Sequence, residues 1–384
     1  MDPALDLAPD LAPDLAGDTS SPALLPDPAG RRVAIVSGSY GAGHDAVAAE
    51  MARRLSRAGA LVTTYDVARL LPLGLGRVLK RVYYAQIRRA PATWGTTLAH
   101  VEPGQPLHRL AVGALGAGSD RVVAAVAGSD LVIATHPFAS QALGVARRRG
   151  TLSVPALTYL TDASVHPLWV HPSVDLHLAM HDVAAEQARR WGGRTVTIQP
   201  IVRAGRPDGL DPLAAYELMG ARALVTGGSL GIGELEEAAR DVLATGVMTP
   251  VVACGSNTSL RRRLELVPGV LALGWRDDLP DVIASCDCVV QNAGGFTSLE
   301  ALAVGTPVVT YRPIPGHGVT NAAGLEQANL AVWPRDPAAL GDALRQVLVG
   351  GRHDRLPHDA PTLVGLLTGT RTFDRGGSLW DEVA

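Results

Sequence analysis

The residues with the clearest potential for chemistry follow an aliphatic run in the last third of the chain. In the stretch QNAGGFTSLEALAVGTPVVT, residues 291–310, Gly294 and Gly295 precede a segment with helical character. Glycines let backbone N–H groups approach a ligand, and a helix N-terminus attracts anions. Glu300 lies about one turn further on, where its carboxylate could accept hydrogen bonds from ribose hydroxyls. Thr297-x-x-Glu300 also fits a capping box, which needs no ligand. The spacing alone leaves both interpretations open.

A second glycine-rich turn, TGGSLGIGE at residues 226–234, follows another aliphatic run. Gly227, Gly228 and Ser229 are suited to a backbone nest for phosphate, but they also suit an ordinary tight turn between a strand and a helix. Taken alone, this turn decides nothing.

A third turn, SGSYGAGHDAVAAEM, places His44 at the start of a predicted helix. The helix dipole there disfavours the imidazolium, so that a neutral imidazole is available to accept a proton. A histidine that only caps the helix is the alternative. The glycines do not follow the dinucleotide order G-x-G-x-x-G. Asp66 nevertheless stands where a Rossmann unit carries its ribose-binding acid, which keeps an NAD enzyme open as a minor interpretation.

The passage YLTDASVHPLWVHPSVDLHLAMH, residues 159–181, concentrates polar side chains. Asp162 ends a predicted strand, and we expect His166, Trp169 and His171 to face a cleft from the proline-broken loop that follows. The histidines lack convincing ligand spacing and no cysteine joins them, so the sequence does not predict a metal site.

A basic amphipathic segment covers residues 69–90. Its apolar residues recur at helical spacing, and Arg77, Lys80, Arg81 and Arg88 occupy mostly the other side. Such a helix can lie on an anionic bilayer, where each cation adds about 1 kcal/mol. A solvated helix packed on its own domain is the alternative, and composition alone favours it.

These residues must be positioned by a regular framework. Short aliphatic runs alternate with longer helix-like segments in both halves of the 384-residue chain. Nearly continuous aliphatic runs separated by helices indicate parallel sheets covered on both faces. We therefore predict an α/β protein with two doubly wound domains joined near residue 204 and a ligand cleft between them. The predicted strands lie in RRVAIVSG, LVTTYDV, LVIATHP, PALTYLTD, LHLAM and RTVTIQP, and then in RALVTGG, TPVVACG, VLALGW, CDCVVQNA, TPVVTYR and LAVWP.

Composition excludes several classes of protein. A formal net charge of −3 argues against a general nucleic-acid binder. Three cysteines without C-x-x-C spacing indicate neither a disulfide framework nor zinc, and fit a reducing cytosol. The acidic Pro/Ala-rich residues 1–30 lack the features of a signal peptide and predict a disordered tail. No apolar run approaches the ~18–20 residues that span a bilayer, so any membrane contact is expected to be peripheral.

Taken together, these motifs resemble the monogalactosyldiacylglycerol synthases of plants and bacteria, in the glycosyltransferase family that also contains the lipid II-forming N-acetylglucosaminyltransferase. The resemblance runs from about residue 33 to about residue 335. The motifs occur in the family's order: GAGHDAVAAEM, TDASVHPLWVHPSVD, TGGSLGIG, ACGSNTSLRRRL, LGWRDDLPDVIASCDCVVQNAGGFTSLEALAVGTPVV and PGHGVTNA. Several motifs in register are far more specific than any one of them.

The resemblance implies two facing Rossmann-like domains of the GT-B type. It implies an acceptor and membrane-binding domain at residues 31–203 and a nucleotide-sugar domain at residues 204–350, and leaves residues 351–384 as an extension outside the resemblance. Glu300 would hold the ribose and His44 would act as base. The resemblance also implies the remaining roles: diphosphate contacts by Gly228, Ser229, Gly294, Gly295 and Thr297; sugar contacts by His317 and Asn321; acceptor hydroxyl contacts by Asp162 and His166; and acceptor or membrane contacts by Gly43, Trp169, Arg77, Lys80 and Arg81.

The implied activity is inverting transfer of a hexose from a UDP-sugar to diacylglycerol, at the cytoplasmic face of the cytoplasmic membrane. It requires neither metal nor other cofactor. Gly316, His317 and Gly318 stand where many synthases have Gly-Gln-Glu, so the sugar is open between galactose, glucose and an N-acetylated hexosamine. The alternatives are an undecaprenyl-linked or soluble acceptor, a nonhydrolysing sugar-nucleotide epimerase, and a nucleotide-sugar sensor without turnover.

Overall fold

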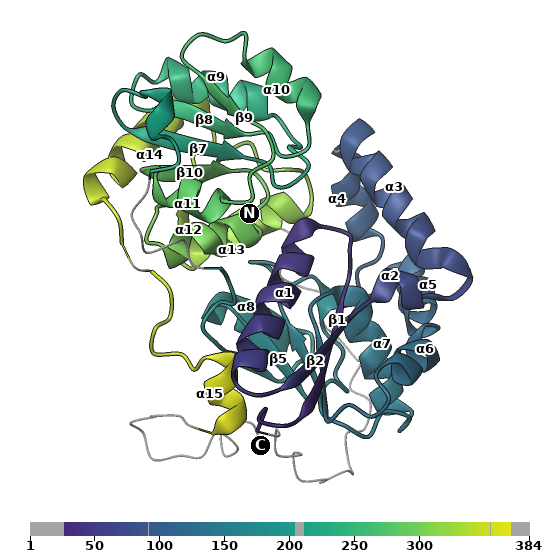
Figure 1. The fold of residues 1–384 in the computed structure, drawn as a ribbon. Coiled ribbons are helices and arrows are strands. Elements are labelled where there is room, and N and C mark those ends of the chain that lie inside the picture. Colours follow the sequence, from purple (N-terminus) through teal and green to yellow (C-terminus); the bar gives the residue numbers. More distant parts are fainter. Residues whose placement is uncertain (1–26, 91, 204–210, 354, 370–384) are drawn as a thin grey trace, which may run out of the picture.

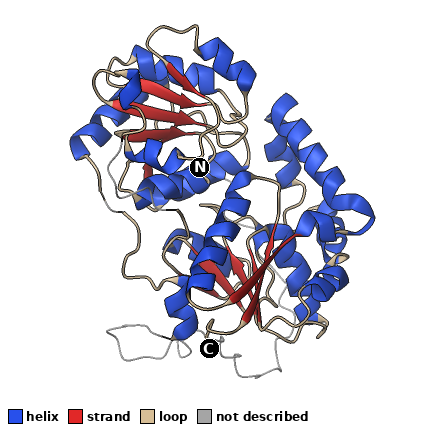
Figure 2. Cartoon of the chain, in the orientation of Figure 1, coloured by secondary structure: helices blue, strands red, loops and turns tan. Residues whose placement is uncertain are grey.

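A computed structural model describes residues 27–90, 92–203, 211–353 and 355–369. It contains two parallel six-stranded sheets with helices against their faces (Figures 1 and 2). Each of the twelve predicted aliphatic runs forms a strand, so the predicted fold class is confirmed. Most of the predicted tail and the end of the C-terminal extension lie outside the described residues.

The N-terminal sheet has the strand order β2-β1-β3-β4-β5-β6. Its central strands are buried from end to end because helices cover both faces. The strands are β1 (Arg32–Ser37), β2 (Leu61–Asp66), β3 (Leu131–Ala134), β4 (Ala156–Tyr159), β5 (Leu176–Ala179) and β6 (Thr195–Thr197).

The C-terminal sheet has the order β12-β11-β10-β7-β8-β9. In both sheets the first strand of the domain, β1 or β7, lies inside the sheet. The strand that follows it in sequence pairs with one side of it, and a later strand, β3 or β10, pairs with the other side. The strands are β7 (Arg222–Thr226), β8 (Thr249–Ala253), β9 (Leu271–Leu273), β10 (Cys288–Gln291), β11 (Val308–Thr310) and β12 (Ala331–Val332).

The helices of the N-terminal half begin with α1, which buries Val47, Met51 and Leu55 against the sheet at four-residue spacing. The others include the predicted amphipathic helix, α3. The helices are α1 (Ala42–Arg57), α2 (Val67–Leu70), η1 (Pro72–Gly74), α3 (Leu75–Arg89), α4 (Ala92–Ala99), α5 (Pro106–Gly116), α6 (Ser119–Ala125), α7 (Pro137–Arg148), η2 (Pro167–Trp169) and α8 (Asp182–Arg190).

The helices of the C-terminal half alternate with its strands. In α14, Asp336 accepts a hydrogen bond from the Ala339 N–H at 2.8 Å and Pro337 follows it at the first helical position, a favourable helix start. The helices are η3 (Ala214–Tyr216), α9 (Leu235–Ala244), α10 (Thr258–Leu264), α11 (Leu279–Ala284), α12 (Phe296–Ala303), α13 (His317–Gln327), α14 (Pro337–Gly350) and α15 (Leu363–Thr368).

The C-terminal extension returns to the first domain (Figure 1). Leu363, Leu366 and Leu367 of α15 are buried in the core between α1 and the N-terminal sheet. The Gln199 N–H donates to the Pro361 carbonyl at 2.9 Å. This part of the predicted extension therefore completes the core of the N-terminal domain.

The two domains meet along helices from both sides. Met180, Val202 and Leu299 form a small buried cluster between them. A Cβ at Gly43 would lie 3.1 Å from the Phe296 side chain, so α1 and α12 approach closely. Within the described residues no helix is long and apolar enough to cross a membrane.

Candidate active site

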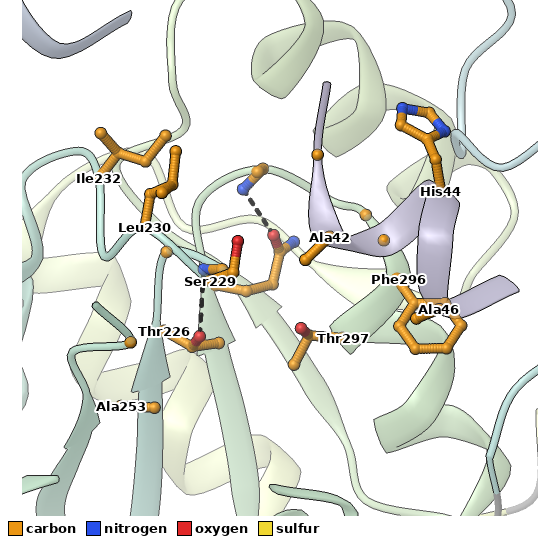
Figure 3. A pocket seen from close by; sticks show the side chains of 18 of the residues that line it. Ala42, His44, Ala46, Thr226, Ser229, Leu230, Ile232, Ala253, Phe296 and Thr297 are labelled. Carbon is orange, nitrogen blue, oxygen red and sulfur yellow. Dashed lines mark hydrogen bonds between the residues drawn. The ribbon is translucent and has the colours of Figure 1, made fainter. Parts of the chain in front are cut away.

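A cavity of about 430 Å³ lies between the domains. It is lined by the turns that follow β1, β7 and β10, where parallel sheets place their ligands, and by α1 (Figure 3). Residues of α3 also line it. The sequence predicts this position. The cavity brings together most of the predicted residues from both domains: Gly43, His44, Asp162, Gly228, Ser229, Gly295, Thr297, Glu300 and His317.

His44 stands in the first turn of α1, above the cavity (Figure 3). Its Nδ1 is 3.1 Å from the Thr135 carbonyl oxygen and 2.9 Å from Thr161 Oγ1. A carbonyl can only accept, so Nδ1 carries the hydrogen and Nε2 keeps its lone pair. The protein thus orients His44 as a proton acceptor, which goes beyond helix capping.

His136 supports this arrangement, and the sequence analysis missed it. Its Nδ1 accepts a hydrogen bond from the Phe138 N–H at 3.2 Å and caps α7. Burial, reinforced by nearby His44, holds the pKa of His136 well below its ordinary value, so a neutral ring packs edge-on against His44 at 4.8 Å. A Cβ at Gly38 would lie 2.4 Å from this ring, so a residue larger than glycine would clash with His136 at this position. The available signal was a His-Pro pair directly after a predicted strand.

Asp162 is held by Trp169. The indole Nε1 donates to Asp162 Oδ2 at 2.9 Å, while Trp169 itself is only 2% exposed. The prediction that this loop turns its side chains toward the cleft is wrong for Trp169 and His171, which are buried because the loop packs on the domain core. His166 is not in the cavity wall, and its Nδ1 accepts from the Leu168 N–H at 3.2 Å to cap η2.

The turn after β10 differs from the predicted phosphate cradle in one respect. Gln291 Oε1 accepts hydrogen bonds from the Ala293 N–H, at 2.8 Å, and from the Gly294 N–H. These two amides are therefore occupied by the protein. Gly295 precedes the first residue of α12, and no side chain of the described residues caps this helix, so the capping-box interpretation of Thr297 and Glu300 is wrong.

Glu300 is buried with its carboxylate incompletely satisfied. It is 3% exposed, and its Oε1 has no hydrogen-bond partner among the described residues. Burial raises its pKa to about 7, and Arg203, whose Nε is 3.8 Å away, opposes that shift. Ser298 Oγ and Asn292 Oδ1, from two more residues of the cavity wall, are also buried without a described partner.

Such unsatisfied groups are informative. Leaving a buried polar atom without a partner costs about 1–3 kcal/mol. Three of them around one cavity, at the end of an uncapped helix, are typical of a site completed by a polar ligand.

The turn after β7 forms the opposite wall. The Gly228 N–H donates to Thr226 Oγ1 at 3.3 Å, and the Gly228 backbone has φ +72°, with open space where a Cβ would stand. The Ser229 carbonyl accepts from the Ser256 N–H at 2.9 Å, which anchors the turn to the next loop. Gly228 and Ser229 thereby expose a bent backbone to the cavity, as a nest for an anion requires.

His317 and Asn321 have different environments although both belong to α13. His317 is half-buried in the cavity wall; burial lowers its pKa, Asp162 across the cleft opposes this shift, and His44 adds to it. Asn321 is 1% exposed and lies outside the cavity wall. Its Oδ1 accepts from Ser164 N–H at 2.8 Å and from Ser164 Oγ at 2.7 Å, and its Nδ2 donates to the Ala293 carbonyl at 2.9 Å.

The two sides of the amphipathic helix α3 have different environments. Arg77 and Arg81 are exposed, with Val78 and Val82 more than half exposed between them. Lys80 turns inward instead: its Nζ donates to Ser39 Oγ at 3.0 Å and lies 5.8 Å from the centre of the Tyr84 ring. The Arg88 side chain lies outside the described part of the chain.

Several residues of the cavity wall escaped the sequence analysis. Tyr83 and Tyr84, from the predicted amphipathic helix, both line the cavity. Burial and the charge of Asp162 raise the pKa of Tyr83 to about 12. Arg203 and the half-exposed Trp275 complete the wall near Glu300 and Gly274. Within the described residues, no cluster of His, Cys, Asp and Glu is arranged for a metal. That no metal is needed stays a prediction.

Comparison with known proteins agrees with this geometry. Residues 44–201 match the family model described as monogalactosyldiacylglycerol (MGDG) synthase, and residues 228–349 match that of glycosyl transferases group 1. A UDP-glucosyltransferase from Polygonum tinctorium superposes with a TM-score of 0.55 at 14% identity, over 89% of this chain and 98% of that one. The fold is of the GT-B glycosyltransferase type. The predicted resemblance to the monogalactosyldiacylglycerol synthases is confirmed.

Further relatives extend the similarity of this GT-B chain. The processive diacylglycerol beta-glucosyltransferase of Bacillus subtilis (strain 168) is 27% identical over 219 residues, which are 53% of this chain and 56% of that protein. The protein of the same name from Bacillus licheniformis is 28% identical over 218 residues, with the same coverage. The chain thus spans about half the length of the curated relatives it matches. A glycosyltransferase of Streptomyces sp. SF2575, complexed with thymidine diphosphate, shares the fold with a TM-score of 0.53 at 16% identity, over 88% of this chain and 99% of that one.

Proposed function

We propose that the protein transfers a hexose, with inversion, from a UDP-sugar to the hydroxyl of diacylglycerol at a membrane surface. The observation that carries the proposal is the buried carboxylate of Glu300, whose Oε1 has no hydrogen-bond partner among the described residues, in a cavity that His44 lines from the other domain. The family match of residues 44–201 and the diacylglycerol glucosyltransferases among the relatives support this acceptor class.

For the UDP-sugar donor, we assign the ribose and the diphosphate to different parts of the cavity wall. Glu300 accepts hydrogen bonds from the ribose hydroxyls, which gives its Oε1 the hydrogen-bond partner that the described residues do not supply. The diphosphate lies between the nest at Gly228 and Ser229 and the uncapped start of α12 at Gly295 and Thr297. Backbone dipoles aimed at the diphosphate stabilise the charge that develops as it leaves, so no metal is required.

The acceptor half assigns the chemistry to the first domain. The Nε2 lone pair of His44 takes the proton of the acceptor hydroxyl, whose oxygen attacks the anomeric carbon. The bond from that carbon to the diphosphate breaks through an oxocarbenium-like state, and UDP leaves with the electron pair. Asp162, held by the Trp169 indole, and His317, at the start of α13, lie on either side of the reacting groups.

In this proposal α3 and α5 form the surface of the protein that binds the membrane. Arg77 and Arg81 attract anionic headgroups, and the exposed Val78 and Val82 enter the interface beside them. Leu110 of α5 is 69% exposed, and α5 packs against the inner side of α3. In a cell this surface would meet the inner face of the cytoplasmic membrane, with nucleic acid playing no part.

The deciding experiment offers the purified protein UDP-galactose, UDP-glucose and UDP-N-acetylglucosamine in equal amounts on anionic vesicles that contain diacylglycerol. Mass spectrometry of the lipid fraction, with chromatographic separation of hexose isomers, identifies product and donor together. We expect a glycosylated diacylglycerol of inverted anomeric configuration.

A matched set of controls gives each alternative its own outcome. The same vesicles without diacylglycerol should yield no glycolipid. An unmodified lipid fraction from protein that binds UDP would move the acceptor to an undecaprenyl-linked or soluble compound. Conversion of one UDP-sugar into its epimer without acceptor would identify an epimerase, and tight UDP binding without any turnover would identify a sensor.

A further inference from the structure

Asn321 connects the donor wall of the cavity to the acceptor wall without touching the cavity itself. Its amide nitrogen donates to the Ala293 carbonyl in the turn before α12, and its amide oxygen accepts from the backbone and the hydroxyl of Ser164 in the other domain. The three distances are 2.9, 2.8 and 2.7 Å. With its amide engaged on both sides and 1% exposed, Asn321 is not available to a sugar hydroxyl.

The surrounding backbone leaves little freedom at this contact. A Cβ at Gly324 would lie 2.6 Å from the Ala163 carbonyl, so α13 and the loop beside Ser164 are in close contact. The Ser164 hydroxyl also lies 2.9 Å from Thr320 Oγ1. The contact is therefore a continuous seam between α13 and residues 163–164.

The two ends of the seam carry different parts of the site. Ala293 belongs to the turn that Gln291 shapes, directly before the anion-binding start of α12. Ser164 follows Asp162 by two residues and Thr161 by three, and Thr161 is hydrogen-bonded to His44. A shift of the donor turn thus reaches the acceptor groups through one buried amide.

We infer that Asn321 and Ser164 form an interdomain latch that couples occupation of the donor turn to the position of the acceptor loop. Asn321 is thereby a positioning residue, not a sugar-binding one. The inference rests on the proposed function, since it assumes that a nucleotide occupies the donor wall.

The test is amide hydrogen exchange of the full chain with and without UDP, read by mass spectrometry over three segments. UDP should slow exchange at residues 226–232 and 292–300 in the wild type, in Asn321→Ala and in Ser164→Ala. At residues 161–166 UDP should slow exchange by about tenfold in the wild type, less in Ser164→Ala, which keeps the backbone bond to Asn321, and not in Asn321→Ala, because one to two hydrogen bonds of about 1 kcal/mol separate the latched and released states.

The outcomes separate the two proposals. Protection at the donor segments with no change at residues 161–166 in the wild type would overturn the latch and leave the donor site standing. An absence of protection at all three segments would overturn the donor site, and the latch with it. Equal protection of residues 161–166 in wild type and Asn321→Ala would also overturn the latch.

The separate effects on kcat and KM give a second test, because a residue with a purely structural role would not lower kcat alone. Asn321→Ala should lower kcat by on the order of 10- to 100-fold, because misplacing reacting groups by about 1 Å costs that much, while the KM for the UDP-sugar changes little. Loss of affinity with unchanged kcat would instead make Asn321 a sugar contact. Thr245→Val is the matched control: its hydroxyl donates to the Val242 carbonyl within the C-terminal domain, far along the chain from the latch.

A double-mutant comparison locates the effect. If Asn321 and Ser164 act through one contact, the double variant should lose less than the product of the two single losses in kcat. Losses that multiply would show that the two residues act independently and would contradict the latch.

Discussion

The two walls of the cavity differ in how completely their polar side chains are hydrogen-bonded within the protein. On the N-terminal wall, His44 and Asp162 each have a hydrogen-bond partner in the protein that fixes the ring or carboxylate. On the C-terminal wall, Glu300 and Ser298 retain buried atoms without a partner among the described residues. If the proposed function holds, the groups proposed to react are oriented before substrate arrives, whereas the groups proposed to bind the nucleotide are completed by the ligand.

The sharpest way to break this comparison is to remove the oriented base. His44→Ala should lower kcat by about 10²-fold or more, because general base catalysis contributes that much, while UDP affinity measured by calorimetry stays unchanged. His353→Ala, an exposed histidine outside the cavity, is the control. Near-normal turnover of the His44 variant would eliminate it as the base.

Burial of the Glu300 carboxylate should make the free energy of unfolding depend on pH. The pKa of Glu300 is about 7 when folded and near its ordinary 4.5 when unfolded. Between these values the folded state holds a proton that the unfolded state has released, so wild-type stability falls as pH rises. Glu300→Gln lacks this penalty and should be the more stable protein above pH 7, by up to about 3 kcal/mol.

This gain should shrink as pH falls and vanish below about pH 4.5, where the carboxyl is protonated in both states. Chemical denaturation of the ligand-free proteins at a series of pH values measures it, with Glu265→Gln as an exposed control. A stability difference that does not vary with pH would mean that burial does not perturb Glu300.

The outer side of α3 offers an internal comparison on one helix. Arg77→Ala with Arg81→Ala should weaken binding to anionic vesicles by about 30-fold, since each cation near the surface contributes about 1 kcal/mol. Lys80→Ala should change vesicle binding much less, because its ammonium group contacts Ser39 and Tyr84 instead. Sedimentation with vesicles of varied anionic content decides this, and equal losses would contradict the inward orientation of Lys80.

The smallest effect expected is on donor affinity. Glu300→Gln should weaken binding of UDP-glucose several-fold, because an amide is a poorer acceptor for two hydroxyls than a carboxylate. Wild-type affinity should rise between pH 6 and 8 as the carboxyl ionises, and the variant should lack that rise. Calorimetry without acceptor measures both, and a variant with unchanged affinity and the same pH profile would remove Glu300 from the ribose site.

Much of the fold follows from local patterns. All twelve strands lie in the aliphatic runs that predict them, because residues of strands buried on both faces must be apolar nearly throughout. The helical spacing of residues 75–87 likewise predicts α3. Glycine turns after strands point to the cavity for the same reason, since parallel strands deliver their C-terminal ends to one edge.

The errors have a common physical origin. Trp169 and His171 look like cleft residues because prolines interrupt the loop, yet packing against the domain core buries them. Lys80 looks like a surface cation, yet Ser39 lies within reach of its ammonium group. Burial and partners depend on segments distant in the chain, which spacing does not report.

The sequence by itself determined the elements, their order and the turns at which a ligand could bind, because these depend on apolar periodicity, glycine and helix ends within short windows. Only the tertiary structure decided which nitrogen of His44 is free, that Glu300 Oε1 has no hydrogen-bond partner in the described part of the chain, and that Asn321 joins the two domains. These properties arise from contacts between residues up to 157 positions apart, which exist only once both domains have packed together.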